Sequence, residues 1–221
     1  SAGTTSTITV AAVNDAPGVA GAGGTLAYTE NDPATVIDAT LTLTDVDDTN
    51  IESATVTISA GNVATEDVLS FTSAFGITGT YTAATGILAL SGTATLAQYE
   101  SVLESVTYQN TSETPNTGNR TITWVVFDGT ANSAGTTSTI TVAAVNDAPG
   151  VAGAGGTLNY TENAPATVID ATLTISDVDD TNIESATVTI SAGNVAGEDV
   201  LSFTSAFGIT GTYTPATGIL A

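Results

Sequence analysis

A long internal repeat constrains the fold of this chain more than any other feature of its sequence. The segment that begins at Ser1 recurs at Ser133, and the two copies can be compared over 89 positions, of which 83 are identical. The six differing pairs are Ala27/Asn159, Asp32/Ala164, Leu43/Ile175, Thr44/Ser176, Thr65/Gly197 and Ala83/Pro215. A period of 132 residues has the length of a whole domain rather than of one solenoid turn. The sequence therefore predicts tandem copies of one domain, as in a long array that grew by duplication.

The motif Val-Asn-Asp-Ala-Pro punctuates the repeat at 13–17 and again at 145–149. Each copy follows a short alternating segment, 7–10 or 139–142, and Asn, Asp and Pro end strands and begin turns. The predicted organisation is a terminal strand of a preceding repeat at 1–13, a complete repeat at 14–145, and a partial second repeat, lacking its last third, at 146–221. We expect that second repeat to expose Val188, Ile190 and Phe203.

Apolar and polar residues alternate with period two through most of the complete repeat, which is typical of half-buried strands. The clearest stretches are 37–44, 54–58 and 122–126. Shorter strands are predicted at 26–28, 68–72, 77–82, 87–90 and 136–142, with a hairpin turn at 83–86. About eight strands joined by short turns predict an all-β fold, a tandem Greek-key β-sandwich.

One segment, 95–105, departs from the strand pattern. Leu96, Tyr99, Val102 and Leu103 are spaced for one face of a helix, and Thr95 followed by Gln98 fits a capping box. We expect one short helix per repeat, packed over an end of the sandwich.

The composition excludes several classes of function. The chain has 23 acidic residues, one basic residue and no histidine or cysteine, for a formal charge of −22. Nucleic-acid binding needs many Lys and Arg residues, and zinc fingers, Ser-His-Asp triads and disulfide frameworks need His or Cys. We therefore expect no enzyme and no catalytic residues. Apolar runs fall short of the roughly 20 residues of a membrane span, so direct membrane insertion is not expected. Arg120 is expected to pair with a carboxylate, and Trp124 and Tyr108 to lie in the core.

Clustered carboxylates suggest a metal site. Asp45-Val46-Asp47-Asp48 follows a predicted strand, and Asp177-Val178-Asp179-Asp180 repeats it. In an extended chain Asp45 and Asp47 project to one side, where a hard cation would relieve their repulsion. Calcium accepts irregular shells of six to eight oxygens, whereas magnesium demands a tight octahedron. The alternative interpretation is that these Asp residues only end strands and keep the chain soluble.

Several motifs together resemble the cadherin-like (immunoglobulin-like) tandem repeats of giant bacterial surface adhesins. A strand, Asp128-Gly129, a hydroxyl-rich strand and Val-Asn-Asp-Ala-Pro are similar to the end of such a repeat. Thr44 to Asp48 resembles the Asp-x-Asp loop, and Glu162-Asn163-Ala164-Pro165 resembles the Glu-Asn-x-Pro strand entry. Leu90-Ser91-Gly92 followed by Ala97-Gln98-Tyr99 is also similar to these repeats.

The resemblance implies Ca²⁺ at the junctions between repeats. Its ligands would be Asn14, Asp15, Asp45 and Asp47 at the upstream junction; Glu30, Asn146, Asp147, Asp177 and Asp179 at the downstream one; and Glu162 in the second repeat. This chain departs from the family in having Ala144 where the linker begins with Asp, and in lacking a counterpart of the Asp-Arg-Glu motif. Fewer ions per junction, or a different shell, are expected.

The predicted function is structural. The chain is expected to contain extender repeats of a long calcium-stabilised extracellular adhesin or surface filament, on the surface of a bacterial cell, with calcium rigidifying the junctions. Its expected partners are neighbouring repeats and other copies in a fibre. A carbohydrate- or cell-binding adhesive module is the alternative. A carboxylate-based glycosidase and ice binding receive less support, because the carboxylates cluster at domain ends and the threonines are scattered over several strands.

Overall fold

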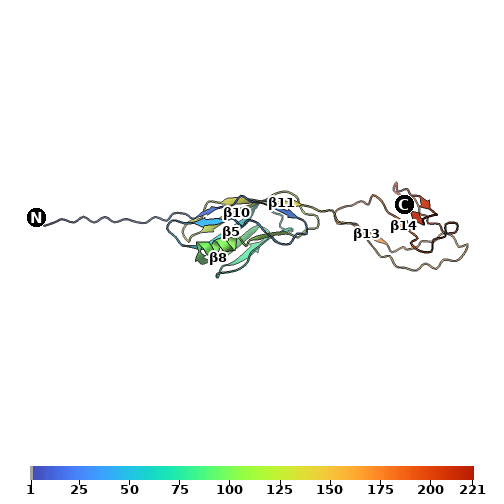
Figure 1. Ribbon diagram of the computed structural model, residues 1–221, viewed down its shortest axis with the longest axis horizontal. Helices are drawn as coiled ribbons and strands as arrows, with labels where there is room; N and C mark the ends of the chain where they lie inside the picture. Colours follow the sequence, from blue (N-terminus) through green and yellow to red (C-terminus); the bar gives the residue numbers. More distant parts are fainter. Residues whose placement is uncertain (1) are drawn as a thin grey trace. The chain divides into compact units, whose positions relative to one another are not determined.

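The computed structural model describes residues 2–221, which form two compact units that divide between Asn146 and Asp147. Figure 1 shows the strands of the first unit and the shorter strands of the second. The described residues are almost entirely strand, turn and irregular segments, with one short helix, which confirms the predicted all-β fold class. None of the described residues forms a helix with the length and apolar character needed to cross a membrane.

The larger layer of the first unit is a six-stranded sheet. Its strands, in spatial order, are β2 (Thr25–Thr29), β11 (Thr136–Ala143), β10 (Arg120–Phe127), β5 (Asn50–Ala60), β8 (Ile87–Thr95) and β7 (Thr78–Thr82). β11 pairs with β2 in parallel, and the other neighbours pair antiparallel. The alternating stretches at 54–58 and 122–126 therefore form the centre of this sheet.

The second layer is built from shorter strands. β3 (Thr35–Val36), β9 (Thr107–Asn110) and β6 (Asp67–Ser70) form one sheet, and β1 (Gly18–Ala20) pairs with β4 (Thr42–Thr44). Trp124 from the large sheet and Tyr108 from β9 both have no exposed surface, as predicted. The ring of Tyr108 meets Tyr28 edge-on, with centroids 5.1 Å apart, so aromatic contacts join the two layers.

The helix α1 (Leu96–Leu103) lies where the sequence predicted it. Thr95 Oγ1 accepts a hydrogen bond from Gln98 N, and Gln98 Oε1 accepts one from Thr95 N, which completes the capping box. Tyr99, Val102 and Leu103 are buried, so one face of the helix closes the core, as its spacing predicted.

The prediction of one continuous strand at 37–44 was wrong. The chain leaves β3 at Val36 and re-enters strand structure only at β4, because Asp38 turns inward and collects hydrogen bonds. Asp38 accepts from Thr40 N and Oγ1 and from Ser138 Oγ, which in turn accepts from the indole N–H of Trp124. A buried carboxylate needs such donors, and the segment 37–41 that carries Asp38 is irregular.

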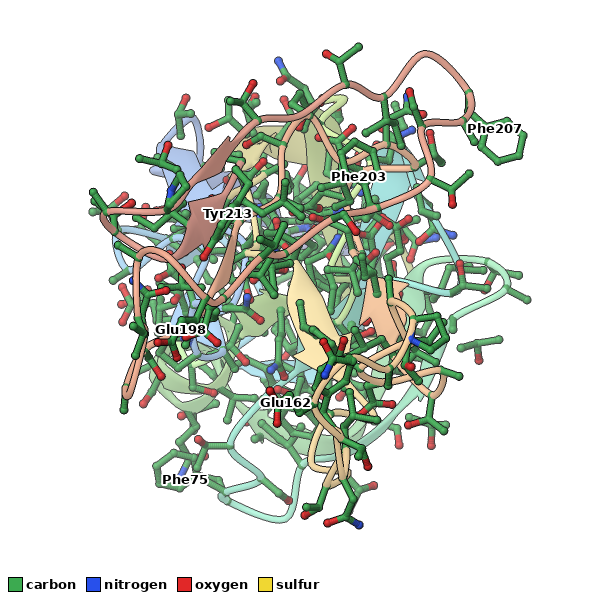
Figure 2. All side chains as sticks on the ribbon, turned by 90° about the vertical axis from the view of Figure 1, so that its right-hand side faces the viewer. Phe75, Glu162, Glu198, Phe203, Phe207 and Tyr213 are labelled. Carbon is green, nitrogen blue, oxygen red and sulfur yellow. The ribbon has the colours of Figure 1, made fainter. Side chains whose placement is uncertain are left out.

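The second unit contains the same sequence with much less strand. Its strands are β12 (Gly150–Ala152), β13 (Thr174–Ser176), β14 (Val188–Thr189), β15 (Tyr213–Thr214) and β16 (Ile219–Leu220). Val188 is 48% exposed and Phe203 is 43% exposed, as expected for residues without covering strands, whereas Ile190 is only partly exposed. Phe207 is fully exposed and projects from its loop (Figure 2).

The terminal strand predicted at 7–10 is not formed. Residues 7–10 belong to no strand, and Ile8 and Val10 are 87% and 89% exposed. The described residues offer this segment no neighbouring strand, and a lone strand leaves its backbone hydrogen bonds to water.

Candidate metal centre

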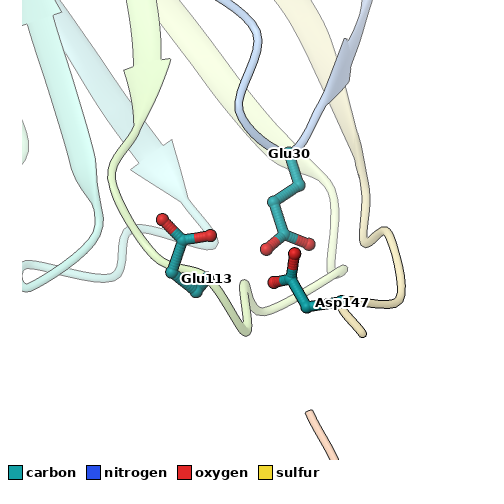
Figure 3. Close-up of side chains that lie close together, drawn as sticks. All are labelled: Glu30, Glu113 and Asp147. Carbon is teal, nitrogen blue, oxygen red and sulfur yellow. The ribbon is translucent and has the colours of Figure 1, made fainter. Parts of the chain in front are cut away.

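Three carboxylates lie close together after the end of β2. Glu30, Glu113 and Asp147 each offer an oxygen, and these oxygens all lie within 4.8 Å of one another. Figure 3 shows the carboxylates of Glu30 and Asp147 facing each other, with Glu113 beside them. Glu30 is buried, Asp147 is half-buried and Glu113 is exposed. Such a group of carboxylates can hold a metal ion.

Backbone hydrogen bonds fix Glu30 at the end of β2. Its amide donates to Ala143 O at 2.8 Å, and its Oε2 accepts from Val145 N at 2.8 Å. Its second oxygen, Oε1, is buried and has no hydrogen-bond partner among the described residues. A buried carboxylate oxygen without a donor costs free energy, and a bound cation would remove that cost. The donor set therefore fits a hard cation.

Glu113 comes from the loop 111–119 between β9 and β10. Asn31, directly after Glu30, adopts a φ of 66° and donates from Nδ2 to Glu113 Oε2 at 3.2 Å. Asn tolerates this left-handed conformation better than most residues. Asn31 thereby links the end of β2 to the loop that carries Glu113.

A buried network fixes the other side of the same loop. Arg120 donates from Nη1 to the carbonyls of Asn116 and Gly118, and from Nη2 to Glu66 Oε2. Glu66 Oε2 also accepts from Asn116 N at 3.0 Å. The one basic side chain of the protein therefore shapes the loop that carries Glu113, and it pairs with carboxylates as the sequence predicted.

Asp147 begins the second unit, and its amide donates to Asp179 Oδ2 at 2.5 Å. Asp177 Oδ1 accepts from the amides of Asp179 and Asp180, both at 3.0 Å. The Asp-x-Asp motif of the second unit therefore contacts Asp147, the residue before Ala148-Pro149.

A second group of polar side chains lies elsewhere in the first unit. Asp15 N donates to Asp47 Oδ2 at 3.1 Å, which repeats the contact between Asp147 and Asp179. Asn14 Nδ2 donates to Asp128 Oδ2 at 2.9 Å, and this bond lowers the pKa of the buried Asp128. Asp128, which the sequence indicated only as part of the Asp-Gly motif near the end of the repeat, therefore belongs to the upstream group.

The expectation that Asp45 and Asp47 project side by side from an extended chain was wrong. Residues 45–48 form a turn in which Asp45 Oδ1 accepts from the amides of Asp47 and Asp48, because Asp bonds its own backbone readily in turns. Burial would raise the pKa of Asp45, but these bonds outweigh it and lower the pKa. This geometry agrees with the simpler interpretation of the motif as a strand terminator.

Asp45 Oδ2 and Glu52 Oε2 are nevertheless buried without hydrogen-bond partners among the described residues. Burial and the nearby charges of Asp48 and Asp128 raise the pKa of Glu52. No sequence motif pointed to Glu52. It lies where the register of β5 against β8 shifts, between Ile51 and Ser53, and such an irregularity is not visible in the sequence alone.

The structure thus brings together some of the expected ligands and separates others. Glu30 and Asp147 converge, and they are joined by Glu113, which the sequence did not indicate. Asn14, Asp15, Asp45 and Asp47 lie in the upstream group, apart from Glu30 along the unit. Asp179 accepts a hydrogen bond from the amide of Asp147 and donates one from its own amide to Asp177. Asn146 directly precedes Asp147, and Glu162 is exposed in the second unit.

Comparison with known proteins gives one similarity to report. The chain is 44% identical over 86 residues to Halomucin of Haloquadratum walsbyi; the match covers 37% of this chain and 1% of Halomucin. No family model matches the chain, and no solved structure matches it. Because this relative is archaeal, the comparison does not support the bacterial origin that the sequence resemblance implied.

Proposed function

We infer that this chain is part of a surface or extracellular structural protein, in which cadherin-like β-sandwich domains follow one another and Ca²⁺ bound by Glu30, Glu113 and Asp147 stiffens the passage between domains. The observation that carries this proposal is the buried Glu30, whose Oε1 has no hydrogen-bond donor among the described residues and whose carboxylate has an oxygen within 4.8 Å of oxygens of Glu113 and Asp147. The role is mechanical: the domains supply length, and the ion restrains the linker.

The donor set favours calcium over other ions. It contains only oxygen, which excludes the soft ligands that zinc and copper prefer. One carboxylate is exposed and one is half-buried, so waters can complete an irregular shell, and calcium accepts such shells. The formal charge of −22 also makes the chain self-repelling, and a divalent cation offsets that repulsion.

The similarity to Halomucin supports a place at the cell surface or outside the cell. Adhesion remains part of the proposal, because the repeats resemble those of adhesins in their motifs. A carbohydrate-binding function receives less support: Tyr28, Tyr99, Tyr108 and Trp124 are all buried, whereas stacking on a sugar needs exposed aromatic rings.

The test compares two glutamates at the same position of the repeat. Glu30→Gln removes a ligand, whereas Glu162→Gln changes its counterpart in the second copy, which is exposed and outside the group of three carboxylates. Calcium should raise the melting temperature of the parent chain and of Glu162→Gln, and titration calorimetry should detect binding to both. In Glu30→Gln both the calcium-dependent rise in melting temperature and the detected binding should fall sharply. Identical melting curves in calcium and in chelator for the parent chain would overturn the proposal.

A further inference from the structure

The outer face of the six-stranded sheet is covered with hydroxyl groups. Alternate residues of each strand point away from the core, and in β2, β11, β10, β5, β8 and β7 most of these outward residues are threonine or serine. The remainder are alanine, valine, isoleucine or phenylalanine, with Asn50 and Glu52 at the start of β5. We call this surface the hydroxyl face. Threonines that are scattered over six segments of the sequence therefore come together on one side of the fold.

The strand register aligns the hydroxyls in rows. One row crosses β2, β11 and β10 as Thr25, Thr139 and Thr121, and another crosses β11, β10 and β5 as Thr137, Thr123 and Thr57. Thr123 Oγ1 donates to Ser59 Oγ at 2.7 Å. Threonine side chains are short and restricted at χ1, so covering this face immobilises few rotamers.

The hydroxyl face is also free of charge. Only two charged residues belong to the six strands, Glu52 and Arg120. Arg120 is fully buried, and Glu52 lies at the register shift of β5 with its carboxylate beside Gly129. The other acidic residues of the first unit lie in loops, at strand ends, in α1 or in the buried network. In a chain of net charge −22, this is a broad neutral surface.

We propose that the hydroxyl face is a lateral self-association surface, on which the same face of a second copy of this chain docks. Two chains of high negative charge repel each other in most orientations, but they meet without like-charge contact when these faces oppose. The contact is isologous. A β-sheet is twisted, and two twisted sheets pack well when their mean strand directions differ by about −30°. A planar surface would therefore match this face less closely.

The size of the face makes each contact weak. Six strands about 4.8 Å apart, sharing about five residues of about 3.4 Å rise, give roughly 400 Å² per copy. The total of roughly 800 Å² lies below the ~1,200–2,000 Å² of stable specific interfaces. In an array of complete repeats, a feature that rests on the proposed function, multivalency compensates for the weakness of each contact. Over the counterparts of β2, β5 and β7, the second copy of the repeat retains the hydroxyl residues, and its one change among these positions, Asn159 for Ala27, adds no charge.

Salt should strengthen this association. The Debye length falls from about 10 Å at 0.1 M to about 3 Å at 1 M ionic strength, so salt screens the repulsion between the acidic parts of the two chains and leaves the neutral contact intact. Calcium is not required, because Glu30, Glu113 and Asp147 lie outside the hydroxyl face.

The absence of cysteine from the chain permits a direct test by disulfide crosslinking. Thr55→Cys places one thiol near the middle of the face on β5, and Thr65→Cys places one on the exposed loop after β5. Both full-length variants are oxidised in chelator at about 0.1 M and about 1 M NaCl. At high salt Thr55→Cys should form dimers on the order of ten times faster than Thr65→Cys, because docking raises the effective thiol concentration. Adding Thr57→Glu to Thr55→Cys should reduce its rate to that of the control.

Equal crosslinking rates for the two cysteines, or no effect of the glutamate, would overturn the proposal. The buried Trp124 reports by fluorescence whether each variant is folded, and Thr80→Glu on β7 is the alternative charge insertion if Thr57→Glu does not fold. Because the assay contains chelator, its outcome is separate from that of the calcium titration. If the protein bound a neutral polysaccharide through the hydroxyl face while its chains stayed monomeric, that result would also contradict docking of a second copy.

Discussion

Arg120 Nε donates to both carboxylate oxygens of Asp67, at 3.1 and 3.2 Å, and neither side chain is exposed to solvent. Tyr108 donates to the same carboxylate at 2.6 Å, and burial together with this bond raises the pKa of Tyr108. Arg120, the one basic residue of this acidic chain, is thus buried rather than at the surface, where it would offset negative charge. The bonds to Asp67 link β6, β9 and β10.

Replacing Arg120 by Gln should destabilise the first unit by about 3–5 kcal/mol, because it leaves the carboxylate of Asp67 buried without its counter-charge. Urea denaturation followed by the fluorescence of Trp124, the only tryptophan, measures the change. The double variant Arg120→Met with Asp67→Leu removes both charges and should recover much of the loss. If the double variant is as unstable as Arg120→Gln, packing rather than charge explains the effect.

Asp38 should give the first unit a pH-dependent contribution to stability. Burial would raise its pKa, but hydrogen bonds from Thr40, Ser138 and Gly24 outweigh burial and lower the pKa below 3.8. Because the folded state favours the ionised form, the contribution is complete above the unfolded pKa and is lost as pH falls through the folded pKa. Asp38→Asn should therefore cost about 1–3 kcal/mol at pH 7 and less at pH 3. A cost that stays constant between the two pH values would contradict this assignment.

The hairpin between β7 and β8 should accept proline at position 83. Thr85 N donates to Thr82 O at 3.1 Å across this turn, and Ala83 occupies the position where proline suits such turns. The second copy has Pro215 at the equivalent position. Ala83→Pro should stabilise the unit by about 0.4–1 kcal/mol, through the lower entropy of the unfolded chain. Thermal unfolding checks this, and a lower melting temperature would show that the proline ring strains the turn.

The capping box of α1 should contribute measurably to stability. Thr95→Ala removes the acceptor for Gln98 N and should cost about 1 kcal/mol, read as a lower denaturation midpoint with an unchanged slope. Thr93→Ala, an exposed change in the same strand, serves as the control. If both substitutions lowered the stability equally, the capping box would make no special contribution to it.

Local sequence patterns correctly predicted the helix, strands and turn whose sequence signals lie within their own residues. The hairpin at 83–86 and the helix after Thr95 follow from turn chemistry and a capping box, which act over three or four residues. The strands around Val56 and Trp124 follow from clear alternation. The segment around Asp38 alternates just as clearly, yet it is irregular, because its carboxylate bonds to Ser138, 100 residues away.

The candidate metal centre was predictable only in part. Glu30 and Asp147 were indicated by their motifs, which mark the ends of the repeat. Glu113 carries no motif, and its link to Asn31 spans 82 residues. The loop that brings it there is shaped by Arg120, so its position depends on a buried ion pair that no local spacing encodes.

The sequence by itself determined that this protein is built from copies of one acidic all-β domain, since the repeat, the alternation and the turns are all local properties of the chain. The tertiary structure decided where strands form. Residues 133–145 repeat residues 1–13 without a change; the former contain β11, paired with β10 and β2, whereas 7–10 belong to no strand. Likewise β5 has 11 residues, but its counterpart β14 has two. A strand needs hydrogen bonds from a neighbouring strand, and whether that neighbour is present is not a property of the strand's own sequence.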